Sequence, residues 1–518
     1  MRKLAPQTDR DTVMVGGRKL SIEDVCAVSR GAPLALSDDK GFRARIERGA
    51  KVLAEAIASG RDVYGVNTGF GDSCTVSIPP EVVNQLPAHL VRYHGCGLGD
   101  YFDEPTTSAI LVTRLSSLSA GYSGVRLQVL TQLEALIRHR IAPLIPEEGS
   151  VGASGDLTPL SYVAAALMGE RRVMHQGREM PAAEALKAHG LTPLTLAPKE
   201  GLALMNGTSV MTALACLAWE RAEYLTRLST RITAMVSIAL GSNPKHFAPG
   251  LFAVKAHAGQ QETAARIFAD MGSSERESPI RIQDRYSIRC APHVIGVLAD
   301  ALPWMRRDIE NELNSANDNP IIDPDDGAIY HGGHFYGGHI AFVADSLKNA
   351  VANVADLLDR QLALLVDTRF NNGLPSNLSG AEGERAALNH GFKAVQIAVS
   401  AWTAEALKLT MPASVFSRST ECHNQDKVSM GTISARDCIR VLELTEQVAA
   451  GCLAAASQAL EIRRRKHARA PSHMQADISA MHDDVFKLCP FVEEDRPLEH
   501  ELRSLCAAIG ERRWPIYA

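Results

Sequence analysis

The sequence predicts a mostly α-helical protein in which a long helical bundle follows an N-terminal domain of mixed structure. The first observation is a set of long segments with apolar residues at helical spacing, at 208–240, 291–316, 338–367, 385–410 and 432–465. The second is that no proline occurs between Pro412 and Pro471, so nothing interrupts a helix there. Short connections make such helices antiparallel neighbours, which is the arrangement of a helical bundle.

Length and composition fit a large globular protein. The chain has 518 residues, of which 46% are hydrophobic and 22% charged, enough for more than one domain. We place a boundary near residue 200, which gives an N-terminal domain at 1–200 and the bundle with C-terminal helices at 201–518. The net charge of −5 offers no electrostatic case for binding nucleic acid or a membrane.

The sequence also indicates a compartment. Its first residues, Met1-Arg2-Lys3-Leu4, lack the apolar run of a signal peptide, and no apolar stretch approaches the roughly 20 residues that span a bilayer. Ten cysteines are scattered without a Cys-x-x-Cys pair, which argues against a zinc or redox site. We therefore expect free thiols, no metal and a reducing cytoplasm.

The elements follow in order along the chain. We expect short helices over 19–60, with Ser21 as the first cap, and a glycine-rich loop at 63–71. A helix over 107–142 and another that begins at Thr158-Pro159 come next. The only β-like patch is a hairpin near Val173 to Met180. Helices that are apolar on more than one face, as in 351–365, need neighbours on both sides and favour an oligomer.

The most informative motif is the stretch Gly149-Ser150-Val151-Gly152-Ala153-Ser154-Gly155-Asp156-Leu157, in which six of nine residues are glycine, alanine or serine. A plain turn is one interpretation. A phosphate-binding loop is excluded because the Gly-Lys-Ser/Thr ending is absent. The third interpretation is self-modification, in which the Gly155 nitrogen attacks the Ala153 carbonyl carbon. Loss of two waters, one of them from the Ser154 hydroxyl, then leaves an exocyclic methylidene that acts as an electrophile.

The run 152–160 resembles the signature of the aromatic amino acid ammonia-lyase and aminomutase family. Further matches extend from Tyr64-Gly65-Val66-Asn67-Thr68-Gly69-Phe70-Gly71 to Asn424-Gln425-Asp426, so the resemblance covers most of the chain. It implies that Ala153, Ser154 and Gly155 form a 4-methylidene-imidazol-5-one (MIO) group. It also implies a homotetramer whose active sites draw residues from three subunits, on a fumarase/aspartase-like helical architecture.

The resemblance assigns roles at the reacting centre. Tyr64 corresponds to the family base, although a tyrosine in a glycine-rich loop is by itself usually a packing residue. Its phenol would need a lowered pKa, which positive neighbours or a helix N-terminus supply. Asn206 corresponds to the asparagine that positions the MIO carbonyl, with a helix N-cap as the alternative.

Other matches concern the substrate. By resemblance Arg289 clamps the carboxylate, Tyr286 is a catalytic residue beside the MIO group, and Gln283 lines the site. The remaining matches to the substrate site are Gly71, Phe335, Glu421 and Asn424. His334 departs from the family, which usually has asparagine there. An imidazole titrates and is larger, so it bears on the local pH dependence and the fit of the substrate.

Two positions bear on the choice of substrate. Gln425 stands where phenylalanine and tyrosine lyases have glutamine and histidine lyases have glutamate. Tyr93-His94 matches no family selectivity pair, but His94 can hydrogen-bond a phenol and so disfavour phenylalanine. We therefore expect tyrosine, giving 4-coumarate. The alternatives are a histidine or phenylalanine ammonia-lyase, a tyrosine 2,3-aminomutase, a fumarase-type lyase without MIO, and a catalytically silent helical scaffold.

One further segment resembles the fumarase and aspartase lyases. The loop from Met271 to Arg285 contains Gly272-Ser273-Ser274, as in their mobile loop, but lacks the Lys and Asn that complete the signature. We expect a polar lid over the site, without a direct part in the chemistry.

Overall fold

The computed structural model describes residues 12–272, 282–466 and 475–517. Contacts divide the chain into two compact units. The first comprises Met1–Glu220, Met305–Asp345 and Pro412–Arg436, and the second comprises Arg221–Trp304, Ser346–Met411 and Asp437–Ala518. Both units are mostly helical, as the sequence predicts, and the boundary placed near residue 200 stays a prediction. The predicted lid loop falls largely on 273–281, outside the described residues.

The first unit is built around short helices. They are α1 (Ile22–Ser29), α2 (Lys40–Ala58), α3 (Leu86–Tyr93), α4 (Glu104–Ser119), α5 (Leu127–Arg138), α6 (Leu157–Leu167), α7 (Ala182–Ala188) and α8 (Glu200–Met205). Ser21 caps α1 in a reciprocal capping box with Asp24, as predicted. The helix predicted over 107–142 is in fact two helices, because Gly121 and Gly124 adopt positive φ between them.

Strands are more numerous than the sequence predicts. The predicted hairpin exists as β6 (Arg172–His175) and β7 (Arg178–Pro181), but it is not the only β structure. The described residues also form β1 (Val13–Val15), β2 (Leu34–Leu36), β3 (Leu98–Tyr101), β4 (Ala142–Pro143), β5 (Pro146–Glu148), β8 (Ile321–Ile322) and β9 (Ile329–Tyr330). β1 and β2 pair in parallel, β3 with β5 and β8 with β9 pair antiparallel, and β4 joins β6.

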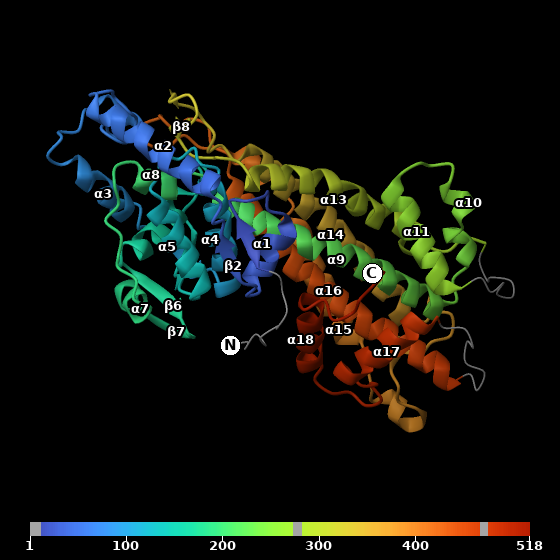
Figure 1. Cartoon of the computed structure of the whole chain (residues 1–518). Helices are drawn as coiled ribbons and strands as arrows, with labels where there is room; N and C mark the ends of the chain where they lie inside the picture. Colours follow the sequence, from blue (N-terminus) through green and yellow to red (C-terminus); the bar gives the residue numbers. More distant parts are fainter. Residues whose placement is uncertain (1–11, 273–281, 467–474, 518) are drawn as a thin grey trace. The chain divides into compact units, whose positions relative to one another are not determined.

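Four long helices carry residues of both units: α9 (Ser209–Leu240), α13 (Ala291–Leu313), α14 (Gly338–Val366) and α16 (Gly431–Lys466), all labelled in Figure 1. Their bounds agree with the periodicity. Most residues of α9 are buried around the whole helix, as expected of a helix with neighbours on all sides. Within the second unit, Gln361 of α14 donates to Thr233 of α9 at 3.0 Å.

The second unit adds α10 (Pro249–Phe252), α11 (Ala258–Met271), α12 (Tyr286–Arg289), α15 (Lys393–Lys408), α17 (Ala476–Leu488) and α18 (Glu499–Gly510). The prediction that a helix starts at 385 is wrong, since α15 begins at Lys393. The preceding backbone forms a loop in which His390 and Gly391 donate N–H groups to the Asp495 carboxylate. Those donors are therefore committed outside the helix.

A buried ion pair fixes the segment that follows α13. Lys199, just before α8, lies 2.5 Å from Asp318, and both side chains are fully buried. Ser123 donates to the other carboxylate oxygen of Asp318. Removal of either charge leaves the other unpaired in the interior, which costs about 3–5 kcal/mol. The pair therefore holds 317–320 firmly beside α8.

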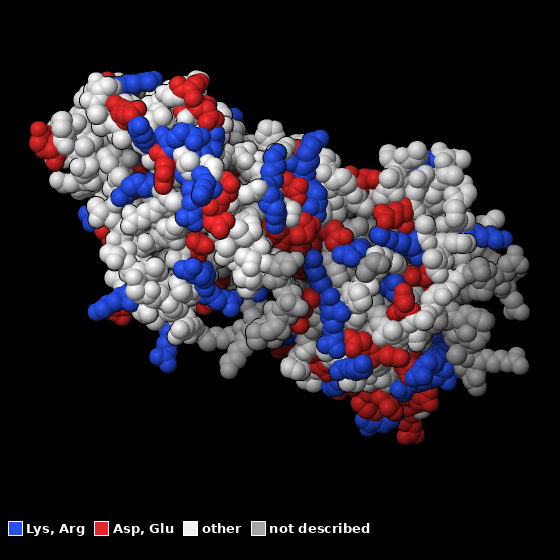
Figure 2. Space-filling model, viewed as in Figure 1, with Lys and Arg blue, Asp and Glu red and all other residues white. Residues whose placement is uncertain are grey.

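The surface carries both signs of charge. On the face shown in Figure 2, lysine and arginine side chains are interspersed with aspartate and glutamate. None of the helices in the described part of the chain combines the length and the apolar character needed to cross a membrane.

Candidate active site

A pocket of about 370 Å³ lies in the first unit and collects side chains from six separate stretches of sequence. Most of the sequence-predicted site residues line it, namely Tyr64, Gly71, Tyr93, His94, Ala153, Ser154, Asn206, Phe335, Glu421, Asn424 and Gln425. The structure therefore brings together residues that lie up to about 360 positions apart in the chain.

The Ala-Ser-Gly turn, residues 152–156, is gripped on one side by Asn206 and Gly207. The Ser154 carbonyl oxygen accepts from Asn206 Nδ2 at 2.8 Å and from the Gly207 N–H at 3.2 Å. Asp156 N–H donates to the Gly207 carbonyl at 2.7 Å. A Cβ at Gly155 would lie within 3.0 Å of that carbonyl oxygen, so only glycine fits there. The turn and residues 206–207 are thus held together by hydrogen bonds in both directions.

Asp156 anchors the turn from below. Its buried carboxylate accepts from Val210 N at 2.9 Å and Met211 N at 3.0 Å, in the first turn of α9. The Ser150 and Thr432 hydroxyls donate to its other oxygen. Burial raises the pKa of Asp156 to about 6, although these donors oppose the rise.

The other side of the turn rests against residues 428–432. Met430 N–H donates to the Val151 carbonyl at 3.0 Å, and Ser429 Oγ donates to the Gly152 carbonyl at 3.1 Å. Ala153 packs against buried Val428 and Met430. The turn is therefore held by two segments remote in sequence, and its shape does not depend on local preference alone.

Gln425 reaches the Ser154 side chain directly. Its Nε2 donates to Ser154 Oγ at 3.2 Å, while its Oε1 accepts from Thr420 Oγ1 at 2.8 Å. The NH₂ group of Gln425 thus faces the turn, and its oxygen faces Thr420.

Tyr64 stands opposite on the glycine-rich loop. Its hydroxyl oxygen accepts from the Gly71 N–H at 2.8 Å. Burial raises the pKa of Tyr64, and the nearby Glu421 carboxylate raises it further, against the effect of the Gly71 N–H. The lowered pKa that a phenolic base needs is therefore not provided by the surroundings of Tyr64 that the structure describes.

Glu421 and Gly71 fit closely. The carboxylate accepts from Asp72 N at 2.8 Å and from Asn424 Nδ2 at 2.9 Å. Gly71 has a φ of +56°, and a Cβ there would lie within 3.0 Å of the Glu421 oxygens, so another residue would strain the backbone and displace this carboxylate. Glu421 therefore braces the loop that carries Tyr64.

His94 presents one defined tautomer. Its Nδ1 lies 2.9 Å from the Leu90 carbonyl oxygen, which is only an acceptor, so Nδ1 carries the proton. Burial lowers the pKa of His94, which keeps the ring neutral near pH 7. Nε2 is then an acceptor. The Tyr93 ring is centred 4.3 Å from the His94 ring and is 58% exposed.

Asn206 is the C-cap of α8, and α9 begins only at Ser209, so the alternative of an N-cap is wrong. Its side-chain amide bonds to the Ser154 carbonyl instead. The buried Oδ1 of Asn206 has no partner among the described residues. A buried acceptor without a partner can be satisfied by a hydrogen-bond donor of a ligand, such as an ammonium group.

The residues of the turn fit the MIO group, which would form from the chain's own Ala153, Ser154 and Gly155. Three small residues, a glycine at positive φ and two donors on the Ser154 carbonyl oxygen give the compact turn that ring closure needs. Within the described ranges no three His, Cys, Asp or Glu side chains form a cluster that would hold a metal ion.

Comparison with known proteins identifies the family. The family model for aromatic amino acid lyases matches residues 20–485. The chain belongs to the aromatic amino acid lyase family. This lyase is 36% identical over 508 residues to a histidine ammonia-lyase of Geobacillus sp. (strain WCH70), with 98% of each chain covered. The resemblance inferred from the motifs is confirmed, and the enzyme is a carbon–nitrogen lyase.

Solved structures agree with the fold. The lyase superimposes on a tyrosine aminomutase from Streptomyces globisporus with a TM-score of 0.90 and 32% identity, covering 97% of this chain and 98% of the other. It matches a histidine ammonia-lyase from Trypanosoma cruzi with a TM-score of 0.87 and 30% identity, covering 97% and 94%. The predicted mostly α-helical architecture is confirmed.

Three predicted residues of the lyase belong to the second unit and are not among those that line the pocket: Gln283, Tyr286 and Arg289. Arg289 Nε donates to the Asp284 carbonyl at 3.0 Å, and its guanidinium lies 4.6 Å from the centre of the Tyr286 ring. Tyr286 is 72% exposed. Arg289 thus lies beside an exposed aromatic ring.

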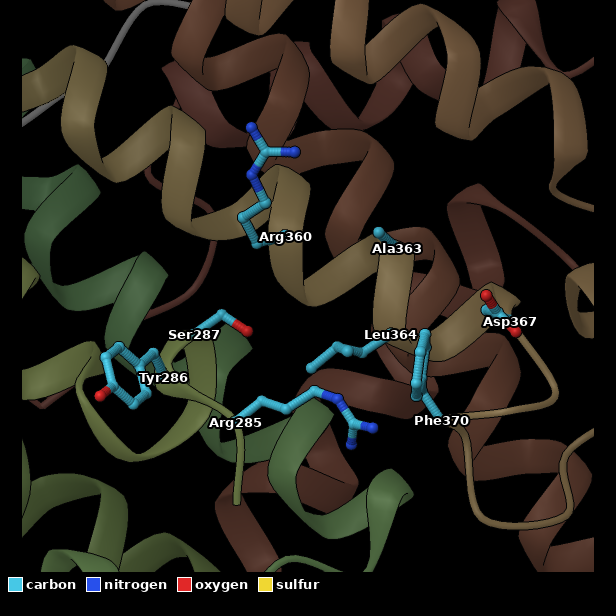
Figure 3. A pocket seen from close by; sticks show the side chains of 8 residues that line it. All are labelled: Arg285, Tyr286, Ser287, Arg360, Ala363, Leu364, Asp367 and Phe370. Carbon is cyan, nitrogen blue, oxygen red and sulfur yellow. The ribbon is translucent and has the colours of Figure 1, made fainter. Parts of the chain in front are cut away.

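The same segment borders a second cavity, of about 340 Å³ (Figure 3). Arg285 extends across it and stacks on Phe370 at 4.0 Å, whereas the Tyr286 ring turns away from Phe370. Arg285 and Phe370 therefore pack against each other in the wall of this cavity, and Tyr286 remains accessible.

The sequence missed several pocket residues: Phe70, Cys74, Leu90, Leu157, Leu202, Asn319 and Lys427. Phe70, Leu157 and Lys427 adjoin or lie within recognised motifs, and that proximity was a usable signal. Leu90 and Leu202 look like ordinary core positions of helices, so the sequence held no signal for them. His334 is exposed and is not one of the residues that line the pocket.

Proposed function

We propose that this lyase eliminates ammonia from an aromatic L-amino acid whose ring carries a hydrogen-bond donor, with L-histidine as the first candidate. The observation that carries the proposal is His94, which is neutral and protonated on Nδ1, so its Nε2 accepts a hydrogen bond. Imidazole N–H and phenol O–H are both donors, whereas the phenylalanine ring has none. An acceptor in the pocket that is left without a partner disfavours phenylalanine.

Histidine ranks first because the relatives are named histidine ammonia-lyases. The preference for tyrosine expected from the sequence is the second candidate. Gln425 favours it, since a neutral amide suits a phenol and a carboxylate suits an imidazole. A solved neighbour named tyrosine aminomutase is a further reason to keep it.

We propose that Ala153, Ser154 and Gly155 form the MIO group by loss of two waters. When present, the group supplies an electrophile that engages the substrate and makes ammonia a better leaving group. Asn206 Nδ2 and the Gly207 N–H hold the Ser154 carbonyl, and the free Asn206 Oδ1 accepts from the substrate ammonium. Phe335 bounds the pocket against water.

Tyr64 is the proposed base for the β-proton. Its phenolate oxygen takes that proton while the Gly71 N–H continues to donate to it. Because the described surroundings raise its pKa, a cation must join the site to reverse the shift. We assign this cation to Arg289 of another subunit, which also binds the substrate carboxylate in a forked geometry.

This assignment requires an oligomer, and we propose a homotetramer. Exposed Tyr286 and Ile282, at 72% and 90%, flank the segment that would enter a neighbouring site. The test is complementation: Tyr64→Phe and Tyr286→Phe chains are mixed, dissociated and reassembled. Hybrid assemblies regain activity if the two residues serve one site from different subunits, whereas no recovery contradicts shared sites. Light scattering gives the number of subunits.

We also propose a cytoplasmic location, supported by ten cysteines that are all free.

The deciding experiment is turnover of L-histidine, L-tyrosine and L-phenylalanine, followed by ammonia release and by absorbance of the conjugated acid. Urocanate and ammonia from histidine support the first candidate, and coumarate from tyrosine supports the second. Efficient turnover of phenylalanine contradicts the role of His94. A β-amino acid in place of ammonia indicates an aminomutase.

The mass of the tryptic peptide that spans 149–156 provides an independent readout. A deficit of two water molecules is expected. An intact Ala-Ser-Gly contradicts the MIO proposal and favours a fumarase-type lyase if turnover persists. Without turnover, it favours a silent scaffold.

A further inference from the structure

Arg114 is a fully buried arginine that the sequence did not single out. It lies on α4, and its Nη1 donates to the Asn206 carbonyl oxygen at 3.2 Å and to Asn317 Oδ1 at 3.4 Å. Its Nη2 donates to Ser117 Oγ at 3.3 Å. A buried guanidinium is expensive to maintain, so its presence against one peptide group calls for a reason.

The peptide that Arg114 contacts is the one that grips the Ala-Ser-Gly turn. The Asn206 carbonyl accepts from Arg114, and the N–H of the same peptide, on Gly207, donates to the Ser154 carbonyl at 3.2 Å. A Cβ at Gly207 would lie within 3.0 Å of Arg114 Nη1, so glycine is what admits the guanidinium. Arg114, the 206–207 peptide and the Ser154 carbonyl form a chain of two hydrogen bonds.

Hydrogen bonds in such a chain reinforce one another. A cation at the carbonyl end of a peptide draws electron density toward its oxygen and makes its N–H a better donor. The effect is largest where water is excluded, and Asn206 and Arg114 are both buried.

We propose that Arg114 is a positioning residue that polarises the Asn206–Gly207 peptide and so strengthens the hydrogen bond from the Gly207 N–H to the Ser154 carbonyl oxygen. The inference rests on the proposed function. After ring closure between Gly155 N and Ala153 C, the Ser154 carbonyl carbon is a member of the ring. Its oxygen stays outside the ring and is conjugated with the exocyclic double bond made from the Ser154 side chain. Donors on its oxygen therefore make that double bond a stronger electrophile.

The charge state and the surroundings of Arg114 support this role. Burial lowers the pKa of Arg114 to about 10, opposed by Asp318 and Asp156, so the guanidinium stays charged at neutral pH. Asp318 is already paired with Lys199 at 2.5 Å, and Asp156 with four donors. The hydrogen bonds of Arg114 go to neutral oxygens, and one of these is the Asn206 carbonyl oxygen.

Lysine is a matched replacement because it keeps the charge but lacks the fork that reaches Asn206 and Ser117 together. Methionine keeps the length and removes the charge. Arg30→Met is the control, since Arg30 pairs with Glu220 at 2.5 Å in the same unit and lies outside the pocket. It reports the effect of losing a paired arginine elsewhere.

The experiment measures the mass of the 149–156 peptide, kcat and KM with the substrate found above, the near-ultraviolet absorption of the ring and the melting temperature. For Arg114→Met we expect a retained deficit of two waters, kcat lowered about 10- to 100-fold and KM changed less than about twofold. The ring absorption moves to shorter wavelength because its carbonyl is less polarised. Arg114→Lys regains part of kcat, and Arg30→Met lowers only the melting temperature.

Other outcomes overturn the inference. A folded Arg114→Met enzyme with wild-type kcat and absorption shows that the charge does not act on the Ser154 carbonyl. Loss of the mass deficit in that folded variant moves the role to ring closure and refutes polarisation. If Arg114→Met does not fold, Arg114→Lys decides by the same kcat and absorption criteria. An intact Ala-Ser-Gly in the wild-type protein instead refutes the proposed function itself.

Discussion

Replacing Asp156 with asparagine tests whether burial raises the pKa of the carboxylate that supports the Ala-Ser-Gly turn. The asparagine Oδ1 can still accept from Val210 and Met211, and the Ser150 and Thr432 hydroxyls can rotate to accept from its NH₂ group. The loss in stability at about pH 7.5 is then only about 1 kcal/mol.

The penalty depends on pH because the folded-state pKa is raised from 3.8 to about 6. A raised pKa means that the folded protein binds the proton more tightly than the unfolded chain. Its stabilising contribution is complete below pH 3.8 and is lost as the pH rises through about 6. Wild type therefore gains about 1.4 kcal/mol between about pH 7.5 and about pH 5, a gain that asparagine cannot share.

The assay is urea unfolding of wild type and Asp156→Asn at the two pH values, followed by circular dichroism. Asp62→Asn, at an exposed position, is the matched control, and its stability difference from wild type should not change with pH. The Asp156→Asn penalty should grow by about 1.4 kcal/mol at the lower pH. A penalty that stays constant or shrinks on acidification refutes the argument from burial.

Four other substitutions test particular contacts. Tyr64→Phe removes the proposed base and one hydrogen bond with Gly71. We expect kcat to fall at least about 100-fold with little change in melting temperature. A kcat equal to that of wild type would exclude Tyr64 as the base. Gly207→Ala places a Cβ against Arg114, so mass spectrometry should show that the mass deficit of two waters is reduced or lost. A full mass deficit with unchanged stability contradicts the close packing of Gly207 against Arg114. Gln425→Glu should raise kcat/KM for histidine relative to tyrosine by about tenfold, because a carboxylate pairs with an imidazole; an unchanged ratio removes Gln425 from the specificity argument. His94 has a lowered pKa, so its contribution to stability is present above about pH 6.5 and is lost as the pH falls below that value. The melting temperature of wild type should accordingly drop more on acidification than that of His94→Asn, and parallel curves would contradict this.

The helical part of the fold was predictable because periodicity over 20 or more residues is a strong signal. The bounds predicted for α9, α14 and α16 lie within one residue of those observed. Apart from the hairpin of β6 and β7, the small sheets were not predictable, since their strands of two to four residues carry no pattern of their own. The start of α15 was missed because Asp495, about 100 residues away, holds the preceding loop.

The candidate site was predictable where it consists of motifs. Ala153, Ser154, Asn206 and Gln425 stand in recognisable runs, and the structure gathers them in one pocket. Arg114 was not predictable, because on a helix among apolar residues it gives no sign of the peptide that it contacts.

The direction of the Tyr64 pKa shift also lay beyond the sequence. It depends on burial and on Glu421, more than 350 residues away in the chain. Environment of this kind arises only in the folded protein.

The way in which the Ala-Ser-Gly turn is held has a consequence for the timing of biosynthesis. Its supports include Gly207, Ser429 and Thr432, and the last of these is synthesised 278 residues after Ser154. If the proposed ring closure depends on these supports, a nascent or misfolded chain carries an unmodified tripeptide and presents no electrophile. Under that proposal, the loss of two waters would mark, molecule by molecule, the chains that have completed their fold.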